Sequence, residues 1–172
     1  MNVPARIDLD DTDRRLLDLL QADASRSNVE LAAAAGVSPA TALRRVKRLV
    51  DAGVIERQVA LVSPTVAPQA LSVIAEVTLD RQGAEHLDAF EARAVAEPAV
   101  QQCWRVSPGP DFVLVLWLPD MTAYDALVRR LFTQDANVRN VRAYFAVKRG
   151  KFDPRVQPSR AWGGTPRALT PP

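Results

Sequence analysis

The segment that spans residues 36–49 constrains the fold of this chain more than any other stretch. Ser38 can accept a hydrogen bond from a free N–H group in the first turn of a helix, and Pro39 suits the first helical position, where no N–H is needed. Gly53 tolerates the left-handed conformation that follows many helices. The sequence therefore predicts a helix that begins after Ser38 and ends near residue 52.

The predicted helix has two unlike faces. Apolar residues at helical spacing form a stripe that comprises Ala42, Leu43, Val46, Leu49 and Val50. Residues spaced i, i+3, i+4 and i+7 form another face that comprises Thr41, Arg44, Arg45 and Arg48. The spacing predicts that the apolar stripe is buried and that the second face is exposed and strongly cationic.

A second capped helix precedes this one. Ser27 and Glu30 have the spacing of a capping box, which opens a short helix that runs to about residue 35. A helix, a tight turn with Gly36, and a second helix with exposed arginines form a helix-turn-helix motif, whose second helix enters the major groove of DNA. The alternative is a basic face that contacts only solvent. The caps, the turn length and the charge placement agree independently and favour the motif.

Further elements complete this first domain. A supporting helix is expected from Asp11, with a buried face that comprises Leu16, Leu17 and Leu20. Residues 54–62 are rich in β-branched side chains and predict a strand, the wing of a winged helix-turn-helix. Prolines interrupt the chain at residues 63–70, so we expect the DNA-binding domain and its linker to cover residues 9–70.

The second half of the chain has the alternating pattern of half-buried strands. The expected strands cover residues 71–79, 100–106, 112–118 and 138–147. The second of these strands is expected to alternate, with one face comprising Val100, Gln102, Trp104 and Val106. One helix is expected over residues 83–96, with an inward face that comprises Leu87, Phe90 and Val95, and Thr122 is expected to cap another. The order βαββαβ predicts a ferredoxin-like unit over residues 71–150, and an α+β fold for the whole chain.

The strand at residues 112–118 is an unbroken apolar run. Two helices of a βαββαβ unit cover only one face of its sheet, so side chains on the other face should be polar unless something covers them. We therefore expect the uncovered face to pack on a second copy of the chain, which gives a dimer with two DNA-binding motifs. The alternative is that the linker or the other domain covers this face.

Composition excludes several classes of protein. Hydrophobic residues make up 48% and charged residues 24% of the chain, which is typical of a soluble globular protein in the cytoplasm. No apolar run is long enough for a membrane span. Cys103 and His86 are the only residues of their types, so no disulfide and no ordinary zinc site is expected, and no cofactor motif occurs. Without a phosphate-binding or nucleophile motif, an enzyme is not expected. Residues 151–172 are rich in proline and basic residues and predict a disordered basic tail.

Several short segments of the sequence resemble those of a known protein family. In the first half they are residues 9–17, 28–32, 36–39, 45–49 and 53–55, and in the second half residues 100–107 and 119–124. Because of these segments, residues 9 to about 150 resemble the Lrp/AsnC (feast/famine) family of prokaryotic transcriptional regulators. The resemblance implies a winged helix-turn-helix followed by a RAM domain, which is ACT-like. It also implies dimers that can assemble into octamers, sequence-specific binding of double-stranded DNA, and association with the nucleoid.

The family also implies an amino acid or related small molecule as effector. The resemblance places the effector region at the turn between the second and third strands, which here includes Ser107, Gly109 and Asp111. The family pattern is Gly-x-Tyr/Phe-Asp, but Pro108 and Pro110 stand at the glycine and ring positions. An architectural DNA-binding protein without an effector is therefore the alternative function.

Residue chemistry assigns roles on the second helix of the motif. We expect Thr41, Arg44 and Arg45 to lie near base edges, because arginine is the usual bidentate reader of guanine. We expect the phosphate contacts to come from the first turn and the distal cations, which comprise Ser38, Pro39, Lys47 and Arg48.

Overall fold

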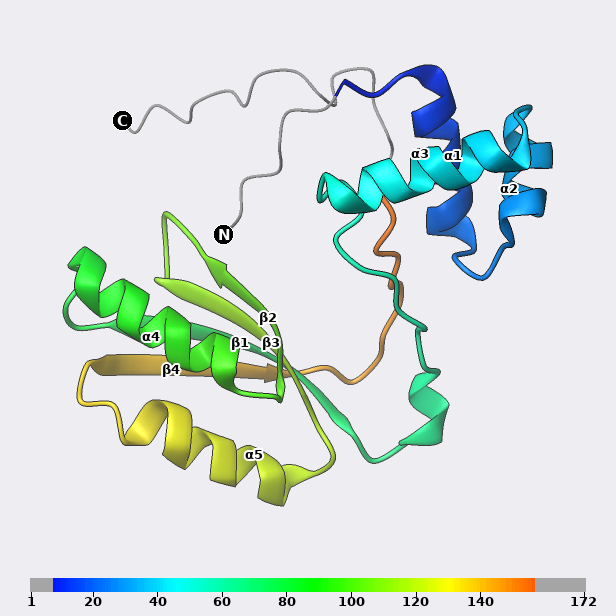
Figure 1. Cartoon of the computed structure of the whole chain (residues 1–172). Coiled ribbons are helices and arrows are strands. Elements are labelled where there is room, and N and C mark those ends of the chain that lie inside the picture. The colour runs from blue at the N-terminus through cyan, green and yellow to red at the C-terminus, as the bar shows by residue number, and fades with distance from the viewer. Residues whose placement is uncertain (1–7, 157–172) are drawn as a thin grey trace. The chain divides into compact units, whose positions relative to one another are not determined.

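The computed structural model describes residues 8–156, which fold into two compact units (Figure 1). Among these residues, 8–61 and 153–156 form the first unit, and 62–152 form the second. No helix in the described range is long and apolar enough to cross a membrane.

The first unit contains three helices, α1 (Asp11–Ala22), α2 (Asn28–Ala35) and α3 (Pro39–Asp51). The predicted supporting helix and both members of the helix-turn-helix motif are therefore confirmed. Asp10 and Asp13 form a capping box on α1, and Ser27 and Glu30 form the predicted capping box on α2. The three helices enclose a small core that comprises Leu9, Leu16, Leu17, Leu20, Leu31, Ala32, Ala42 and Leu49.

The turn between α2 and α3 is tight and fully hydrogen-bonded. Gly36 adopts a left-handed conformation with φ 72°, and the Val37 N–H donates to the Ala32 carbonyl at 3.0 Å. The Ser38 hydroxyl then accepts the Thr41 N–H at 3.2 Å, as its predicted role as N-cap requires. Since each end is satisfied locally, the turn fixes the direction in which α3 leaves α2.

The buried stripe of α3 differs from the prediction. Ala42 and Leu49 are fully buried, but the side chains of Leu43 and Val50 are 53% and 47% exposed. The helix is turned about its axis so that Arg45, which contacts α1, lies close to the buried side. The prediction that Leu43 and Val50 are core residues is therefore wrong for this unit.

The strand predicted at residues 54–62 is absent. Val54 and Ile55 pack on the core of the first unit, but residues 56–62 are exposed and extended without a strand partner among the described residues. The β-branched composition favours an extended backbone, but a strand also needs a second strand to complete its hydrogen bonds. The prediction of a strand at residues 54–62 is therefore wrong. These residues form an unpaired segment that is followed by the short 3-10 helix η1 (Pro64–Val66).

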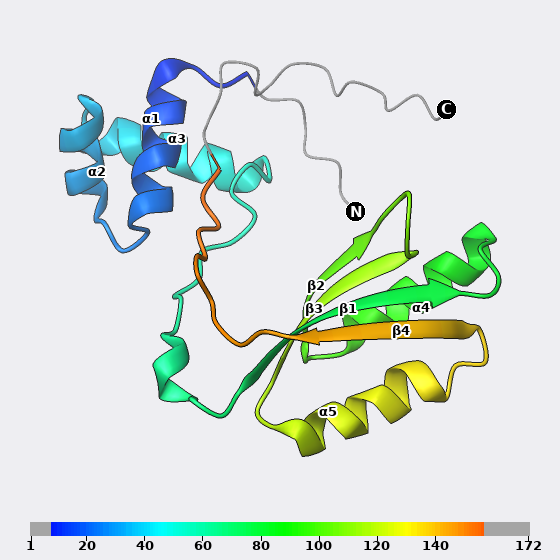
Figure 2. The ribbon, with the colours of Figure 1, turned by 180° about the vertical axis from the view of Figure 1, so that it is seen from behind.

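The second unit has the predicted βαββαβ order. Its four antiparallel strands are β1 (Leu71–Leu79), β2 (Val100–Arg105), β3 (Phe112–Leu118) and β4 (Val138–Phe145), in the spatial order β2-β3-β1-β4. The helices are α4 (Ala84–Ala96) and α5 (Met121–Leu127), and α5 continues as a π-helical segment, η2 (Val128–Thr133). Both helices lie on one face of the sheet, so the other face is open (Figure 2). The α+β, ferredoxin-like fold class is confirmed.

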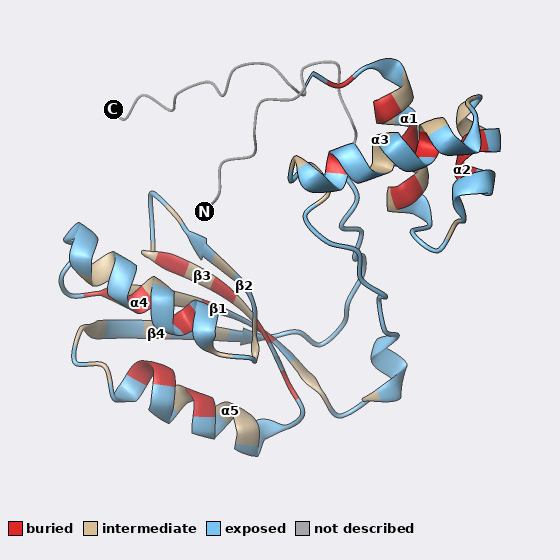
Figure 3. Ribbon diagram, viewed as in Figure 1, coloured by how far each residue is buried: buried red, intermediate tan, exposed pale blue. Residues whose placement is uncertain are grey.

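The core of the second unit lies between the sheet and its two helices (Figure 3). Phe90 of α4 is buried as predicted, whereas Val95 is 65% exposed and Ala94 faces the core in its place. The N-cap of α5 is Asp120, which accepts the Ala123 N–H at 2.8 Å, and not Thr122. Both corrections shift the predicted position by one or two residues without changing the element.

A bulge changes the alternation of β2. Val100 pairs with Leu116 and Gln102 with Val115, so the register shifts between them. Val100 therefore packs on the helix side, while Trp104 lies on the open face with 58% of its surface exposed. The predicted single face for these residues is wrong, because the extra residue of a bulge reverses the direction of the side chains that follow.

Part of the predicted tail contacts the first unit. The side chain of Gln21 accepts the Val156 N–H at 2.8 Å and donates to its carbonyl at 2.9 Å. The described residues 151–156 are extended and exposed. The remainder of the predicted disordered tail, residues 157–172, lies outside the described part of the chain.

Candidate nucleic-acid interface

The outer face of α3 begins one residue earlier than the predicted face. Its members are spaced i, i+3, i+4 and i+7 and are all exposed, and they comprise Ala40, Leu43, Arg44 and Lys47. Ser38 and Pro39 at the helix start are also exposed. This face, which we call the outer face of α3, is the surface that the second helix of the motif offers to a partner (Figure 3).

Arg45 lies on the side of α3 that faces α1. Its Nη1 donates to Asp10 Oδ2 at 2.7 Å and to Asp13 Oδ1 at 2.9 Å, and only 22% of its side chain is exposed. Its Nε is buried and has no hydrogen-bond partner within the described chain. The hydrogen bonds that Arg45 donates to Asp10 and Asp13 raise its pKa above the ordinary value. The guanidinium thus points toward α1 and is bonded to carboxylates of the same unit.

Asp10 is held as an anion by the same contacts. Desolvation raises the pKa of this carboxyl group, but the backbone N–H of Asp13 and the guanidinium of Arg45 outweigh it and leave the pKa below its ordinary value of 3.8. Asp10 also caps α1, so one carboxylate links the start of α1 to the middle of α3.

The three other cations of α3 differ in how they are held. Arg44 has no ion pair or hydrogen-bond partner among the described residues. Lys47 pairs with Asp51 at 2.8 Å, but both side chains are well exposed, so this contact is weak. Arg48 is bonded to the buried Asp13 through Nη2 and keeps 43% of its side chain exposed. Arg44 and Lys47 are therefore the cations of α3 that are most available to a partner.

Thr41 is half-buried, and its hydroxyl lies 2.9 Å from the hydroxyl of Ser38. Both hydroxyls belong to the first turn of α3, where the free N–H groups and the helix dipole favour a negatively charged group. The first turn therefore offers donors for a phosphate beside the outer face.

The open face of the second unit's sheet is rich in exposed apolar side chains. Its most exposed large members are Ile74, Trp104, Trp117 and Tyr144, with exposed fractions between 40% and 58%. Val113 and Val115 of β3 lie among them, half-buried. Neither helix of the second unit covers this face (Figure 2). An apolar sheet face of this kind is typical of a surface that packs on a partner.

The predicted effector turn is held by Asp111. Its Oδ2 accepts the Leu79 N–H at 2.7 Å, and its own N–H donates to the Val77 carbonyl at 2.9 Å. Ser107 and Gly109 are exposed in the same turn, and Gly109 has φ 125°. Asp111 thus fixes the loop to the end of β1.

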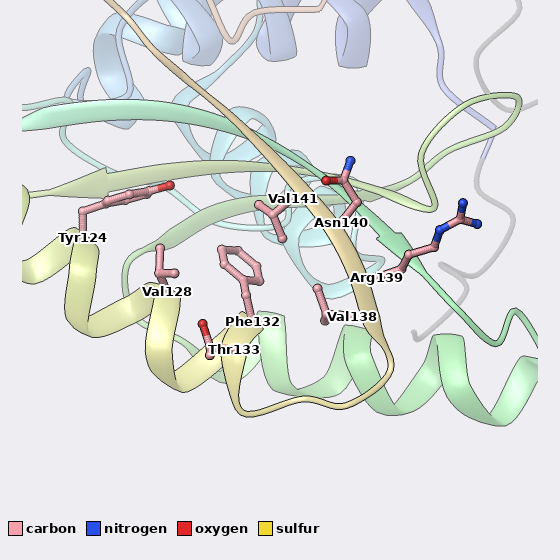
Figure 4. Close-up of a pocket in the computed structure, with 8 residues that line it drawn as sticks. All are labelled: Tyr124, Val128, Phe132, Thr133, Val138, Arg139, Asn140 and Val141. Atoms are coloured by element: carbon pink, nitrogen blue, oxygen red, sulfur yellow. The ribbon is translucent and has the colours of Figure 1, made fainter.

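A shallow hollow of about 330 Å³ lies between β4 and the helix formed by α5 and η2 (Figure 4). Its apolar lining comprises Val128, Phe132, Val138 and Val141. Tyr124 borders it, and burial raises the pKa of this phenol. Arg139 and Asn140 extend away from the other lining side chains. Ser107, Gly109 and Asp111 do not line this hollow, so the structure does not bring the predicted effector residues to it.

Comparison with known proteins decides the family. A leucine-responsive regulatory protein from Salmonella typhimurium is 35% identical over 149 residues, which cover 87% of this chain and 91% of that protein. The chain belongs to the Lrp/AsnC family. Residues 9–56 match the family model for winged helix-turn-helix DNA-binding, and residues 72–156 match the Lrp/AsnC ligand binding domain. This Lrp/AsnC protein is a DNA-binding transcriptional regulator and not an enzyme.

Other members of the Lrp/AsnC family agree in sequence and fold. An HTH-type transcriptional regulator from Haemophilus influenzae is 37% identical over 145 residues, which cover 84% of this chain and 86% of that protein. A transcriptional regulator from Neisseria meningitidis, solved in complex with L-Met, is 29% identical with a TM-score of 0.78. The match covers 86% of this chain and 96% of that one.

Sequence reasoning missed the carboxylate partners of Arg45 in this Lrp/AsnC protein. Asp13 precedes Leu16, Leu17 and Leu20 at the spacing i, i+3, i+4 and i+7, so it belongs to the buried stripe of α1. A carboxylate on such a stripe needs a buried cationic partner. That spacing was the available signal, and it would have indicated a buried cationic partner without showing which residue supplies it.

Proposed function

We propose that this Lrp/AsnC regulator binds specific sequences of double-stranded DNA through the outer face of α3. The observation that carries the proposal is Arg44, an exposed arginine without a partner in the described chain, beside Lys47 on the second helix of a helix-turn-helix. Base edges are read by unpaired donors of this kind in the major groove. We place this activity in the cytoplasm, at the nucleoid.

The contacts of each residue suggest its role on DNA. Arg44 reads a base edge, and Thr41 assists from the same turn of the helix. Lys47, Arg48 and the first turn at Ser38 and Pro39 contact phosphates. The base-reading role first expected for Arg45 is replaced by a positioning role, because its guanidinium is bonded to Asp10 and Asp13.

We also propose that the regulator is a homodimer, which can assemble further into octamers. The apolar open face of the sheet supports this, because exposed tryptophans at Trp104 and Trp117 are costly to leave in water. Packing two such faces buries them and joins two DNA-binding motifs in one molecule. A symmetric pair of motifs suits a pseudo-palindromic site.

For the ligand binding domain we propose an amino acid or a related small molecule as effector. The match of residues 72–156 to this domain supports a ligand, and the Neisseria regulator is a relative solved with L-Met. Ser107, Gly109 and Asp111 remain the proposed contacts. Oδ2 of Asp111 already accepts one backbone hydrogen bond, and the carboxylate keeps further acceptor sites for an ammonium group.

A specific observation keeps a second function open. Pro108 and Pro110 occupy the effector turn, and Asp111 is engaged in holding it. An effector-independent architectural DNA-binding protein would need only such a fixed loop. Thermal-shift measurements of the full chain with each of the twenty amino acids distinguish the two functions. A shift with one of them that also changes DNA affinity supports the effector, and a flat response supports the architectural role.

DNA binding is tested by selection from a random double-stranded library with the full chain. We expect one enriched sequence, bound far more tightly than a scrambled copy. The variant Lys47→Ala should weaken binding to both and reduce the dependence on salt concentration by about one phosphate contact. If no sequence is enriched and binding is equally weak for both, the proposal of sequence-specific binding is wrong.

A further inference from the structure

Leu43 is an unusual residue to leave exposed on α3. Its side chain is 53% exposed, although it lies in the middle of a helix whose opposite side carries the fully buried Ala42 and Leu49. More than half of its surface is therefore in solvent on the outer face of α3. An exposed apolar side chain at this position can contact a partner that offers an apolar group.

The neighbours of Leu43 indicate the chemistry of that partner. Residues three and four apart are neighbours on a helix surface, so Leu43 lies beside Ala40 and Lys47, and Arg44 follows it directly. The apolar group is thus bordered by cations on the outer face. An apolar patch bordered by cations complements a polyanion that also offers apolar groups, which the major groove of DNA does.

The position along the helix agrees with this partner. Base edges are contacted by the N-terminal residues of the second helix of the motif, and Leu43 follows the N-cap Ser38 by little more than one turn. Val50 is similarly exposed, but it lies in the last turn beside the anionic Asp51. Of the two large exposed apolar residues of α3, only Leu43 is therefore placed for a base.

One base offers what Leu43 can bind. A leucine side chain neither donates nor accepts hydrogen bonds, so it cannot distinguish the polar edges of guanine, cytosine or adenine. Thymine alone presents a methyl group at the edge of the major groove. We propose that Leu43 is a specificity-determining residue that contacts the 5-methyl group of a thymine. This inference rests on the proposed binding of α3 in the major groove.

Replacing thymine by uracil tests the contact, because the change removes only the methyl group. The full chain first selects its site from a random double-stranded library, and each thymine of the enriched site is then replaced singly by uracil. At one thymine we expect wild-type affinity to fall about fourfold, the gain from burying one methyl group. Leu43→Ala should bind the thymine and uracil forms equally there and keep its other base preferences. Val50→Ala is the matched control and should retain the preference for thymine.

The outcomes separate this inference from the proposed function. If the library yields an enriched site but uracil is tolerated at every thymine, or if Leu43→Ala keeps the thymine preference, the role of Leu43 is disproved and DNA binding stands. If no site is enriched, both the proposed sequence-specific DNA binding and the role of Leu43 are wrong. Sedimentation of Leu43→Ala adds a further check. If this variant is monomeric where the wild type is an oligomer, Leu43 packs on a second copy of the chain and its proposed role is wrong.

Discussion

Arg45 of α3 donates a hydrogen bond of 2.9 Å to the fully buried carboxylate of Asp13 in α1. This pair fixes the rotation of α3 about its own axis, because the long side chain that might have pointed outward is held against the supporting helix. The residues of the outer face, Leu43, Arg44 and Lys47, are exposed as a consequence. The proposed interface with DNA therefore depends on a contact between α1 and α3 that lies outside this interface.

Asp13→Asn should destabilise the first unit. The amide leaves the Arg48 guanidinium without its anion and the Arg45 guanidinium with only Asp10, which costs about 2 kcal/mol. Hydrogen exchange of the α3 amides in the full chain measures this change. Asp11→Asn is the matched control in the same turn. Its carboxylate is exposed in a pair with Arg14, so the effect should stay below about 0.5 kcal/mol. Equal effects of the two substitutions would contradict a structural role for Asp13.

Acid should weaken the same contact through Asp10. The pKa of Asp10 is lower in the folded chain than its ordinary value of 3.8, so its ionised form stabilises the fold. This contribution is complete above about pH 4 to 5 and is lost as the pH falls through the lowered value. Asp10→Asn keeps a good N-cap but removes the charge. The difference in melting temperature between wild type and this variant should shrink between pH 5 and about pH 3, and a constant difference would rule out the linkage.

The rotation of α3 is tested by paired truncations. Leu49→Ala should cost about 3 kcal/mol of unfolding free energy, because the side chain is fully buried. Leu43→Ala should cost less than about 1 kcal/mol, since more than half of its side chain is already in solvent. Denaturant unfolding of the wild type and the two variants measures these losses of unfolding free energy. A larger loss for Leu43→Ala would mean that Leu43 is a core residue, as the sequence predicts, and that α3 is rotated differently.

The proposed dimer predicts the effect of a charge on the open sheet face. Trp117→Asp places a carboxylate within the apolar face and should convert the dimer to a monomer at micromolar concentration. Val95→Asp is the control, because Val95 is an exposed apolar residue on α4, on the opposite side of the sheet from the open face. Sedimentation velocity should give a dimer for wild type and Val95→Asp. A monomeric wild type would refute the dimer.

The elements were predictable because their signals are local. Caps such as Ser27 and Ser38 and the alternation of β1 depend on a few adjacent residues, and each appears where the sequence indicates. The rotation of α3 was not predictable from its own pattern, because it depends on Asp10 and Asp13, more than thirty residues away. The strand at residues 54–62 failed for a related reason, since a strand needs a partner that the local sequence does not specify.

The outer face of α3 is proposed to read DNA, with Arg44 as its base reader. The most direct measurement repeats the selection from a random double-stranded library with Arg44→Ala and compares the enriched sequence with that of wild type. We predict that the preference for guanine at one position per half-site is lost, at a cost of about 1–3 kcal/mol for that base, while the other positions are unchanged. An enriched sequence identical to that of wild type, selected with equal affinity, would contradict the account.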